Sequence, residues 1–193
     1  LTDRVDFATF SGHKFHAVRG VGFVYKKAGK KITPLLTGGG QEKDFRSTTE
    51  NVAGIASMAK ALRLVTDKEE FSLPKIAKMK KIIFDELAKY EDITIFSGEG
   101  EDFAPNILTF GIKGVRGEVI VHAFEEHQIY ISTTSACSSK AGKPAGTLIS
   151  MGVPTKLAQT AVRISLDDDN DMGQVEQFLT IFKQVYAKTQ KVR

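Results

Sequence analysis

An α/β fold is predicted for this chain of 193 residues by the order of its elements and by its composition. Short apolar runs typical of strands alternate with longer segments whose apolar residues recur at helical spacing. Hydrophobic residues make up 41% of the sequence and charged residues 26%, which is enough to bury a core and excludes collagen-like, low-complexity and disordered chains. Because no run of about 18 apolar residues is present, we expect no membrane span and no membrane partner.

The first part of the chain predicts a piece of a parallel sheet followed by a helix. Asp6–Ser11 is expected to form a mostly buried strand that ends in a turn, and Val21–Tyr25 a second strand. The run Gly38–Gly40 lacks both the dinucleotide-binding and the phosphate-loop pattern, so it predicts a flexible turn. Between Glu50 and Val65 the apolar residues fall on one helical face.

The remainder of the chain predicts a smaller α+β unit. The polar run Lys68–Glu70 is expected to separate the two parts. Pro74 is expected in the first turn of a new helix, where its missing N–H costs nothing. Beyond that helix we expect strands at 93–96, 106–112, 129–133 and 161–166, and helices at 117–127 and 172–188.

Charge and cysteine content indicate which partners and which redox compartment to expect. The net charge of +4 is spread along the sequence, which favours ordinary solubility over an RNA partner. Cys137 is the single cysteine and cannot form an internal disulfide, so a reducing cytoplasm is expected. The first residues show neither a signal-peptide pattern nor an initiator Met, and we expect the chain to derive from a longer protein.

The turn Ser11–Lys14 is the first candidate for chemistry. A lysine at the C-terminal end of a sheet strand is well placed to contact a ligand in an α/β fold. Ser11 and His13 beside Lys14 could hold an anion such as phosphate. The alternative is that Lys14 is an ordinary surface lysine in a turn.

Cys137 is the second candidate. It lies within the small, polar, glycine-containing segment Ser132–Thr147, which predicts a mobile loop. Lys140 and Lys143 lie nearby in the sequence, and neighbouring cations favour the nucleophilic thiolate. The alternative is that Cys137 is a small buried hydrophobic residue.

Arg163 is the third candidate, because it interrupts the apolar strand AVRIS. The charge of an arginine cannot be removed in a protein, so a guanidinium in a strand of this kind needs an anionic partner. Its two-pronged geometry suits a structural carboxylate and the carboxylate of a ligand equally well. The sequence leaves both possibilities open.

The acidic run Asp167–Asp171 resembles the start of a calcium loop, but Met172 and Phe178 stand where that loop needs Gly and Glu. Acidic residues at this position predict a cap for the helix that follows. No metal site is predicted from the histidines either, since none has ligand spacing with the single cysteine: His16, His122 and His127.

Five segments, in this order, resemble the NifS/IscS-type cysteine desulfurases: SGHKFHAVRGVGFVY, GGGQEKDFRSTTENV, APNIL, STTSACSS and AVRISL. These enzymes belong to the class V aminotransferase group and have the fold-type I architecture of pyridoxal-phosphate enzymes. The similarity extends over nearly the whole chain.

The resemblance implies a cofactor and the residues that hold it. The cofactor is pyridoxal 5'-phosphate, and Lys14 matches the lysine that binds it covalently. Ser11 and His13 match positions that contact its phosphate. Thr49 matches a threonine that reaches the phosphate bound by the other subunit of a homodimer.

The resemblance also implies a reaction. Arg163 matches the arginine that holds the substrate carboxylate, and Cys137 matches the cysteine that becomes a persulfide. L-Cysteine would be converted to L-alanine, and the sulfur would pass to an acceptor such as an iron–sulfur scaffold or a tRNA-thiolation enzyme. The alternatives are a selenocysteine lyase or another class V relative, and a non-catalytic module that docks acceptors.

The family fold begins with a substantial N-terminal region that this sequence lacks, so the chain resembles the C-terminal half of such an enzyme. Residues 1–69 would be the end of the large cofactor-binding domain, and residues 70–193 the small domain with the cysteine loop. We expect residues 70–193 to fold compactly and residues 1–69 to be poorly packed. The isolated chain is expected to be inactive.

Overall fold

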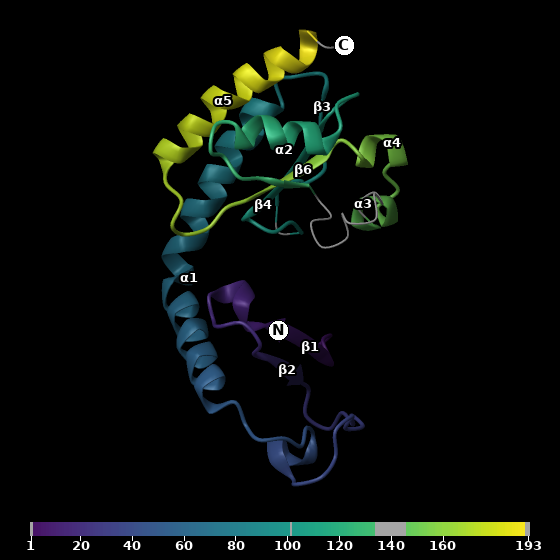
Figure 1. Ribbon diagram of the computed structural model, residues 1–193, viewed down its shortest axis with the longest axis vertical. Helices are drawn as coiled ribbons and strands as arrows, with labels where there is room; N and C mark the ends of the chain where they lie inside the picture. Colours follow the sequence, from purple (N-terminus) through teal and green to yellow (C-terminus); the bar gives the residue numbers. More distant parts are fainter. Residues whose placement is uncertain (1, 101, 134–145, 192–193) are drawn as a thin grey trace. The chain divides into compact units, whose positions relative to one another are not determined.

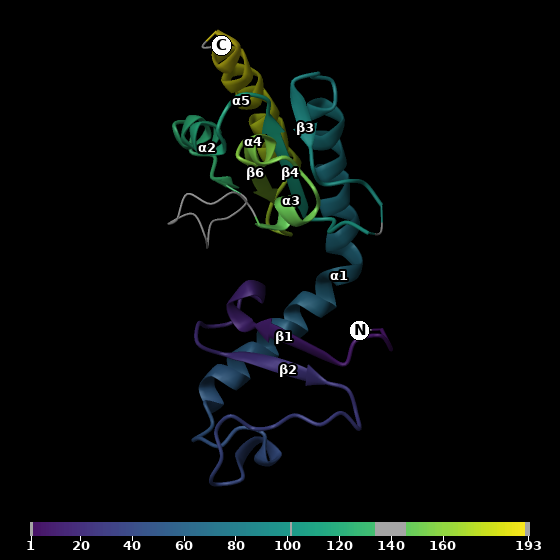
Figure 2. The ribbon, with the colours of Figure 1, turned by 90° about the vertical axis from the view of Figure 1, so that its right-hand side faces the viewer.

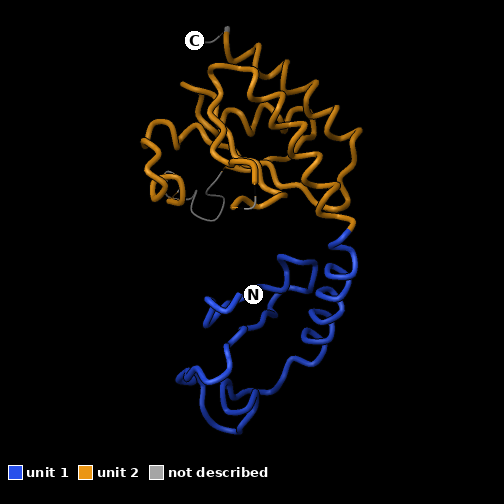
Figure 3. The backbone as a smooth tube through the Cα atoms, turned by 180° about the vertical axis from the view of Figure 1, so that it is seen from behind, with its two compact units in different colours: residues 1–70 blue, residues 71–193 orange. Residues whose placement is uncertain are grey.

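The computed structural model describes residues 2–100, 102–133 and 146–191, and the chain divides into two compact units. Unit 1 comprises residues 1–70 and unit 2 residues 71–193 (Figure 3). The division falls within helix α1 (Val52–Leu87), which contributes its first half to unit 1 and its second half to unit 2.

Unit 1 contains a two-stranded antiparallel sheet. Strand β1 (Phe7–Ser11) pairs with β2 (Gly22–Lys26) along its whole length (Figure 2). The prediction of a mostly buried strand in a parallel sheet is therefore wrong for these residues. Successive residues of β1 alternate between exposed and half-buried, because a sheet of two strands has too few neighbours to bury both of its faces.

Aromatic contacts hold this hairpin together. The rings of Phe10 and Phe23 stack with centroids 4.5 Å apart, and Phe15 meets Phe23 edge-on at 6.3 Å. Among the described residues of unit 1, the only buried apolar side chains are those of Ala17 and Ala61. The other described apolar side chains of this unit remain at least partly exposed to solvent.

Helix α1 differs from the two helices predicted from the sequence. It runs without interruption for 36 residues, with Pro74 inside it and Lys68–Glu70 in its middle. Lys and Glu are strong helix formers, so a polar run of these residues does not end a helix. Residues 62–71 are all exposed, which explains why the sequence reads as a boundary although the backbone stays helical.

Unit 2 is built on a four-stranded antiparallel sheet in the order β3-β4-β6-β5, of which Figure 1 labels β3, β4 and β6. Its strands are β3 (Ile93–Ile95), β4 (Ile107–Ile112), β5 (Ser132–Thr133) and β6 (Ala161–Ser165). Its helices, besides the end of α1, are α2 (Gly117–Glu125), α3 (Gly146–Ser150), α4 (Thr155–Ala158) and α5 (Met172–Lys191).

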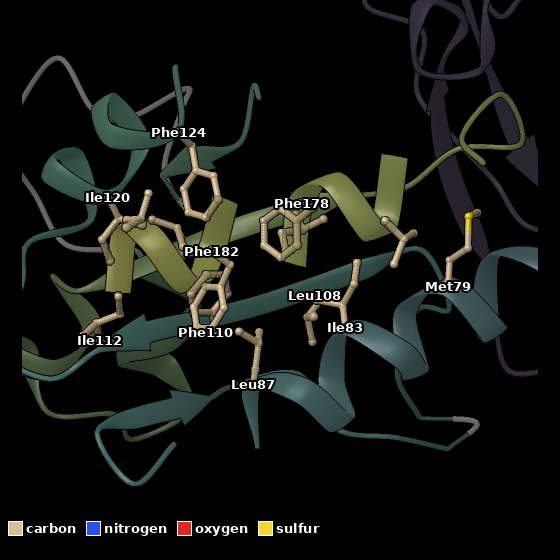
Figure 4. Close-up of a cluster of buried hydrophobic side chains, with 14 of the residues drawn as sticks. Met79, Ile83, Leu87, Leu108, Phe110, Ile112, Ile120, Phe124, Phe178 and Phe182 are labelled. Carbon is tan, nitrogen blue, oxygen red and sulfur yellow. The ribbon is translucent and has the colours of Figure 1, made fainter. Parts of the chain in front are cut away.

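The core of unit 2 lies between one face of the sheet and three helices. Apolar side chains from α1, α2 and α5 meet alternate residues of β4 and β6, and Figure 4 shows these side chains converging. Phe124 of α2 stacks on Phe178 of α5 with ring centroids 5.1 Å apart. Because side chains alternate along a strand, the intervening residues of β4 and β6 lie on the opposite face.

Most predicted elements of unit 2 are confirmed to within a residue or two, and three differences remain. The strand expected at 129–133 is only two residues long, because its ladder with β6 covers Ser132 and Thr133 alone. Helix α2 ends at Glu125, and Gln128 takes a left-handed backbone with a φ of 59°. The short helices α3 and α4 were not predicted. Among the described residues, no helix is both long and apolar enough to span a membrane.

Candidate functional site

The turn that carries Lys14 follows directly from strand β1. Residues Gly12–Phe15 form the 3-10 helix η1, which places Ser11, His13 and Lys14 at the C-terminal end of the strand, as predicted. His16 closes the turn with a left-handed backbone, and its N–H donates to the carbonyl of Gly12. The side chains of Ser11, His13 and Lys14 are all exposed in this chain.

Gly12 lies where the sequence predicts the turn after the first strand, and the structure shows why the turn requires a glycine. Its N–H donates to the carbonyl of Val21 at 2.9 Å, and its own carbonyl accepts from the N–H of Ala17 at 3.0 Å. A Cβ atom on Gly12 would lie 2.9 Å from the Val21 oxygen and 3.0 Å from Ala17 Cβ. The close approach of β2 therefore fixes the turn, and a glycine directly after a strand was the signal for it.

The segment after the turn is attached to helix α1. The backbone N–H of Val18 donates to Ser57 Oγ at 3.3 Å. Thr49, the predicted phosphate-contacting threonine, lies exposed three residues before α1 begins. Its expected partner is the phosphate held by a second subunit, and this assignment stays a prediction.

In unit 2, Arg163 occupies the middle of β6 and has a strand on either side. It lies opposite Thr109 of β4 and opposite Ser132 of β5. Residues directly opposite each other in a sheet share a face, so the guanidinium lies between two hydroxyl-bearing side chains. Val162 and Ile164 are buried in the core, which puts Arg163 on the other face of the sheet.

The charge of Arg163 is not compensated by the described part of the chain. Its Nε atom is buried and has no hydrogen-bond partner there, and no described carboxylate forms an ion pair with the guanidinium. A buried, unsatisfied donor costs about 1–3 kcal/mol, and more when it is charged. Of the two partners that the sequence left open, a structural carboxylate is absent among the described residues, and a ligand carboxylate satisfies the requirement.

Two neighbours of Arg163 were not singled out from the sequence. Thr109 is buried, and its N–H donates to Ser97 Oγ at 2.8 Å, which ties the end of β3 to β4. Ser132 falls both in the strand expected at 129–133 and in the predicted loop segment Ser132–Thr147, and in the structure it begins β5. Once Arg163 is placed in a strand, the pairing register identifies both hydroxyl groups, but the register is not readable from sequence alone.

Two predictions from the sequence remain, the role of Cys137 and the acidic cap before α5. Cys137 lies outside the described residues, and so do Lys140 and Lys143. The acidic run before α5 is confirmed as a helix cap. Asp171 Oδ1 accepts from the N–H of Gln174 at 2.9 Å, and Gln174 Oε1 accepts from the N–H of Asp171 at 3.2 Å.

The described groups with displaced pKa values lie on α1 or directly after its end, away from these candidates: Lys80, Lys81, Glu86, Lys89 and Tyr90. Burial lowers the pKa of Lys80, whose Nζ donates to the carbonyls of Gly98 at 3.1 Å and Ala104 at 2.9 Å. Hydrogen bonds from Lys89 and Lys183 lower the pKa of Glu86. These groups make contacts that stabilise unit 2, and they are not part of the candidate site.

The side chains at the two candidate positions suit a cofactor that carries an aldehyde and a phosphate, and a substrate that carries a carboxylate. The primary amine of Lys14 can bind an aldehyde covalently, and the hydroxyl and imidazole beside it can donate to phosphate. The guanidinium of Arg163, whose Nε has no partner among the described residues, can hold a carboxylate through two parallel hydrogen bonds. These residue types are the ones that a pyridoxal-phosphate enzyme requires.

The comparisons with known proteins agree with this class. Residues 3–178 match the model of the aminotransferase class-V family, and the chain belongs to that family of pyridoxal-phosphate enzymes. A NifS/IcsS protein homolog of Lactobacillus delbrueckii subsp. bulgaricus is 47% identical over 192 residues, which cover all of this chain and 50% of that protein. The cysteine desulfurase IscS of Dictyoglomus turgidum is 35% identical over 162 residues, covering 84% of this chain and 41% of the relative.

Solved structures confirm the predicted α/β fold. The NifS-like protein of Rickettsia africae matches with a TM-score of 0.81 and 32% identity, over 95% of this chain and 48% of that structure. This chain spans about half the length of the curated relatives that it matches.

Proposed function

We propose that the protein to which this chain belongs is a pyridoxal-phosphate-dependent cysteine desulfurase, which converts L-cysteine to L-alanine. The observation that carries the proposal is the guanidinium of Arg163, buried at Nε and without a partner among the described residues. The names of the relatives, NifS/IcsS homolog and cysteine desulfurase, support it. On this reading residues 1–69 belong to the large cofactor-binding domain and residues 70–193 are the small domain.

Arg163 would bind and orient the amino-acid substrate. A bidentate contact fixes both oxygens of the carboxylate, and Thr109 and Ser132 on either side can donate to the same group. Because Val162 and Ile164 anchor β6 in the core, the guanidinium is held on a rigid element. The substrate would therefore be held in one orientation relative to the sheet.

Lys14 would hold the cofactor and then move a proton. When bound, pyridoxal phosphate supplies an electron sink for negative charge on the substrate. Ser11 and His13 would hold its phosphate. The Lys14 amine would accept the Cα proton of the substrate and return it.

Cys137 would take the sulfur. Its thiolate attacks the sulfur of the bound cysteine, an S–S bond forms, and the C–S bond breaks with its electron pair left on the substrate carbon. A proton then completes alanine, and Cys137 is left as a persulfide. The cationic sequence neighbours Lys140 and Lys143 support the thiolate.

The proposal also includes the oligomeric state, the sulfur acceptor and the cellular location of the enzyme. Thr49 would contact the cofactor phosphate of a second subunit in a homodimer. The persulfide would pass to a sulfur-acceptor protein, either an iron–sulfur scaffold or a tRNA-thiolation enzyme. The enzyme would act in the cytoplasm, where a single unpaired cysteine stays reduced.

Substitution of Arg163 in the full-length protein tests the proposal. Loss of a bidentate charged contact costs on the order of 2–4 kcal/mol, so Arg163→Ala should lower kcat/KM for L-cysteine by roughly 30- to 1000-fold. The cofactor absorbance should remain. Arg116→Ala is the matched control, because Arg116 is an exposed arginine paired with Glu118 at 3.4 Å. Equal kinetics for the Arg163 variant and this control would contradict the proposal.

A further inference from the structure

Strand β3 makes one hydrogen bond with β4 beyond its last residue pair and then leaves it. The N–H of Phe96 donates to the carbonyl of Thr109 at 2.8 Å. In a complete antiparallel ladder the carbonyl of Phe96 would accept from the N–H of Thr109 in return, because the two residues of such a pair exchange both bonds. That N–H donates instead to Ser97 Oγ at 2.8 Å. A side-chain hydroxyl therefore replaces a backbone acceptor at the end of this ladder.

The chain leaves the sheet directly after Ser97. The Nζ of Lys80 donates to the carbonyls of Gly98 and Ala104, which holds the loop that follows. Ser97 and Thr109 are both buried, so the N–H of Thr109 has no ready access to water. A buried donor that loses its acceptor is costly. The N–H of Thr109 thus depends on the hydroxyl of Ser97.

On its other side, Thr109 faces Arg163 of β6. The N–H of Leu166 donates to the carbonyl of Asn106 at 2.8 Å. Hydrogen-bonded pairs alternate with non-hydrogen-bonded pairs along an antiparallel ladder, so Thr109 and Arg163 form a pair of the second kind, in which side chains approach more closely. The backbone N–H and carbonyl of Thr109 therefore bond toward β3, to Ser97 and the residue before it, while its side chain lies beside the guanidinium.

We propose that Ser97 is a positioning residue of the carboxylate site and acts through Thr109. This inference rests on the proposed function, in which Arg163 and Thr109 hold the carboxylate of L-cysteine. The hydroxyl of Ser97 fixes the N–H of Thr109 and, with it, the place of the Thr109 hydroxyl beside Arg163. Because the carboxylate is held equally before and during the reaction, loss of this positioning weakens substrate binding and leaves the chemical step unchanged.

Steady-state kinetics of the full-length protein with L-cysteine test the role of the Ser97 hydroxyl. Ser97→Ala should raise KM at least about fivefold and leave kcat within about twofold of wild type. Ser97→Thr and Ser97→Val have side chains of the same shape, and only the threonine variant should keep the KM of wild type. This pair isolates the hydroxyl even where alanine disturbs the loop.

Thr189→Val is the matched control. Thr189 is also buried, and its Oγ1 donates to the carbonyl of Tyr186 at 2.7 Å in the last turn of α5. Its loss should lower the stability of unit 2 and leave KM unchanged. An equal KM in Ser97→Ala and in this control would overturn the proposal.

A double-mutant cycle tests whether Ser97 acts through Thr109. Thr109→Val removes the hydroxyl beside Arg163 and should raise KM about tenfold. In the Thr109→Val protein, Ser97→Ala should raise KM by less than about twofold more, because the group that it positions is gone. Effects on KM that multiply independently would overturn the proposal.

Hydrogen exchange gives a readout that does not depend on turnover. The amide of Thr109 should exchange at least about tenfold faster in Ser97→Ala than in wild type, and Thr189→Val should not change it. Faster exchange with an unchanged KM would show that Ser97 only stabilises the fold, and would overturn its positioning role.

Arg163→Ala separates this inference from the function on which it rests. If Arg163→Ala raises KM while Ser97→Ala matches Thr189→Val, the role of Ser97 alone is overturned. If Arg163→Ala leaves the kinetics with L-cysteine unchanged, the proposed function fails and the role of Ser97 fails with it.

Discussion

Arg163 on β6 lies directly opposite Thr109 on β4, and the two side chains share the face of the sheet that the core of unit 2 leaves free. The core residues on either side of Arg163 hold the strand in place, while its own Nε atom has no partner among the described residues. Stability alone does not require an arginine here. On the proposed function, a ligand carboxylate would supply the partner that this arginine lacks among the described residues.

The variant Gly12→Ala tests whether close packing of the Lys14 turn is needed for function. The added Cβ would meet Val21 O and Ala17 Cβ at about 3 Å, so β2 or η1 must shift, at a cost of roughly 1–3 kcal/mol. In the full-length protein we expect weaker retention of pyridoxal phosphate, measured by absorbance after dialysis. Gly146→Ala is the control, because a Cβ there meets nothing within 4 Å. The same cofactor loss in both variants would rule out a specific role for Gly12.

The variant Lys80→Met tests the hydrogen bonds that Lys80 makes to the loop after β3. It leaves the carbonyls of Gly98 and Ala104 without their donor, and we expect a loss of about 1–3 kcal/mol in the free energy of unfolding. Urea denaturation measures it. The neighbouring variant Lys81→Met removes an exposed lysine and should leave the urea midpoint nearly unchanged. Equal destabilisation by the two variants would contradict the structural role of Lys80.

The pH dependence of stability gives Lys80 a second test. Burial lowers the pKa of Lys80 in the folded chain. Between that lowered pKa and the ordinary value for lysine, the unfolded chain holds more protons than the folded chain, so the Lys80 contribution to stability rises with pH. The difference in unfolding free energy between wild type and Lys80→Met should therefore grow as pH rises through this window. A constant difference would show that the pKa of Lys80 is not lowered.

Glu86 should contribute to the pH dependence of the free energy of unfolding at acid pH. Its carboxylate accepts from Lys89 at 2.6 Å and from Lys183 at 3.3 Å, and these contacts lower its pKa in the folded chain. Its contribution is then present above the ordinary carboxyl pKa and is lost as pH falls through the lowered value. Glu86→Gln should flatten the acid limb of the stability curve, while Glu91→Gln, exposed and nearby, should leave it in place.

The cap of helix α5 should account for a measurable part of the stability of unit 2. Asp171→Ala removes the oxygen that accepts from the N–H of Gln174, and we expect a loss of about 1 kcal/mol. Asp169→Ala, exposed two residues earlier, is the control. Thermal unfolding that is the same for both variants would mean that the cap contributes nothing.

The sequence predicts those elements of this fold whose signals are local. Strand β6 and helix α5 follow from an apolar run and from a helical apolar face that begins after an acidic cap. Helix α1 was divided wrongly, because Pro74 and the polar run before it look like a boundary whether or not the helix continues. Whether it continues depends on what each half packs against, and local sequence does not contain that information.

In the candidate site, too, the residues with a local signal could be predicted and those that depend on long-range pairing could not. Lys14 and Arg163 could be singled out because a lysine after a strand and an arginine within one are unusual on chemical grounds. The hydroxyl groups beside Arg163 depend on the register of three strands, which long-range pairing sets. Family resemblance, rather than periodicity, was needed to assign roles to Cys137 and Thr49.

The proposed desulfurase reaction is tested most directly by the fate of sulfur on Cys137. The full-length protein with bound pyridoxal phosphate is given L-cysteine without a reductant, alkylated, digested, and analysed by mass spectrometry alongside an alanine assay. We expect the Cys137 peptide to gain one sulfur atom for each alanine formed, and Cys137→Ser to abolish both. Alanine formed at the parental rate with no sulfur on Cys137, or undiminished sulfide release by Cys137→Ser, would contradict the proposal.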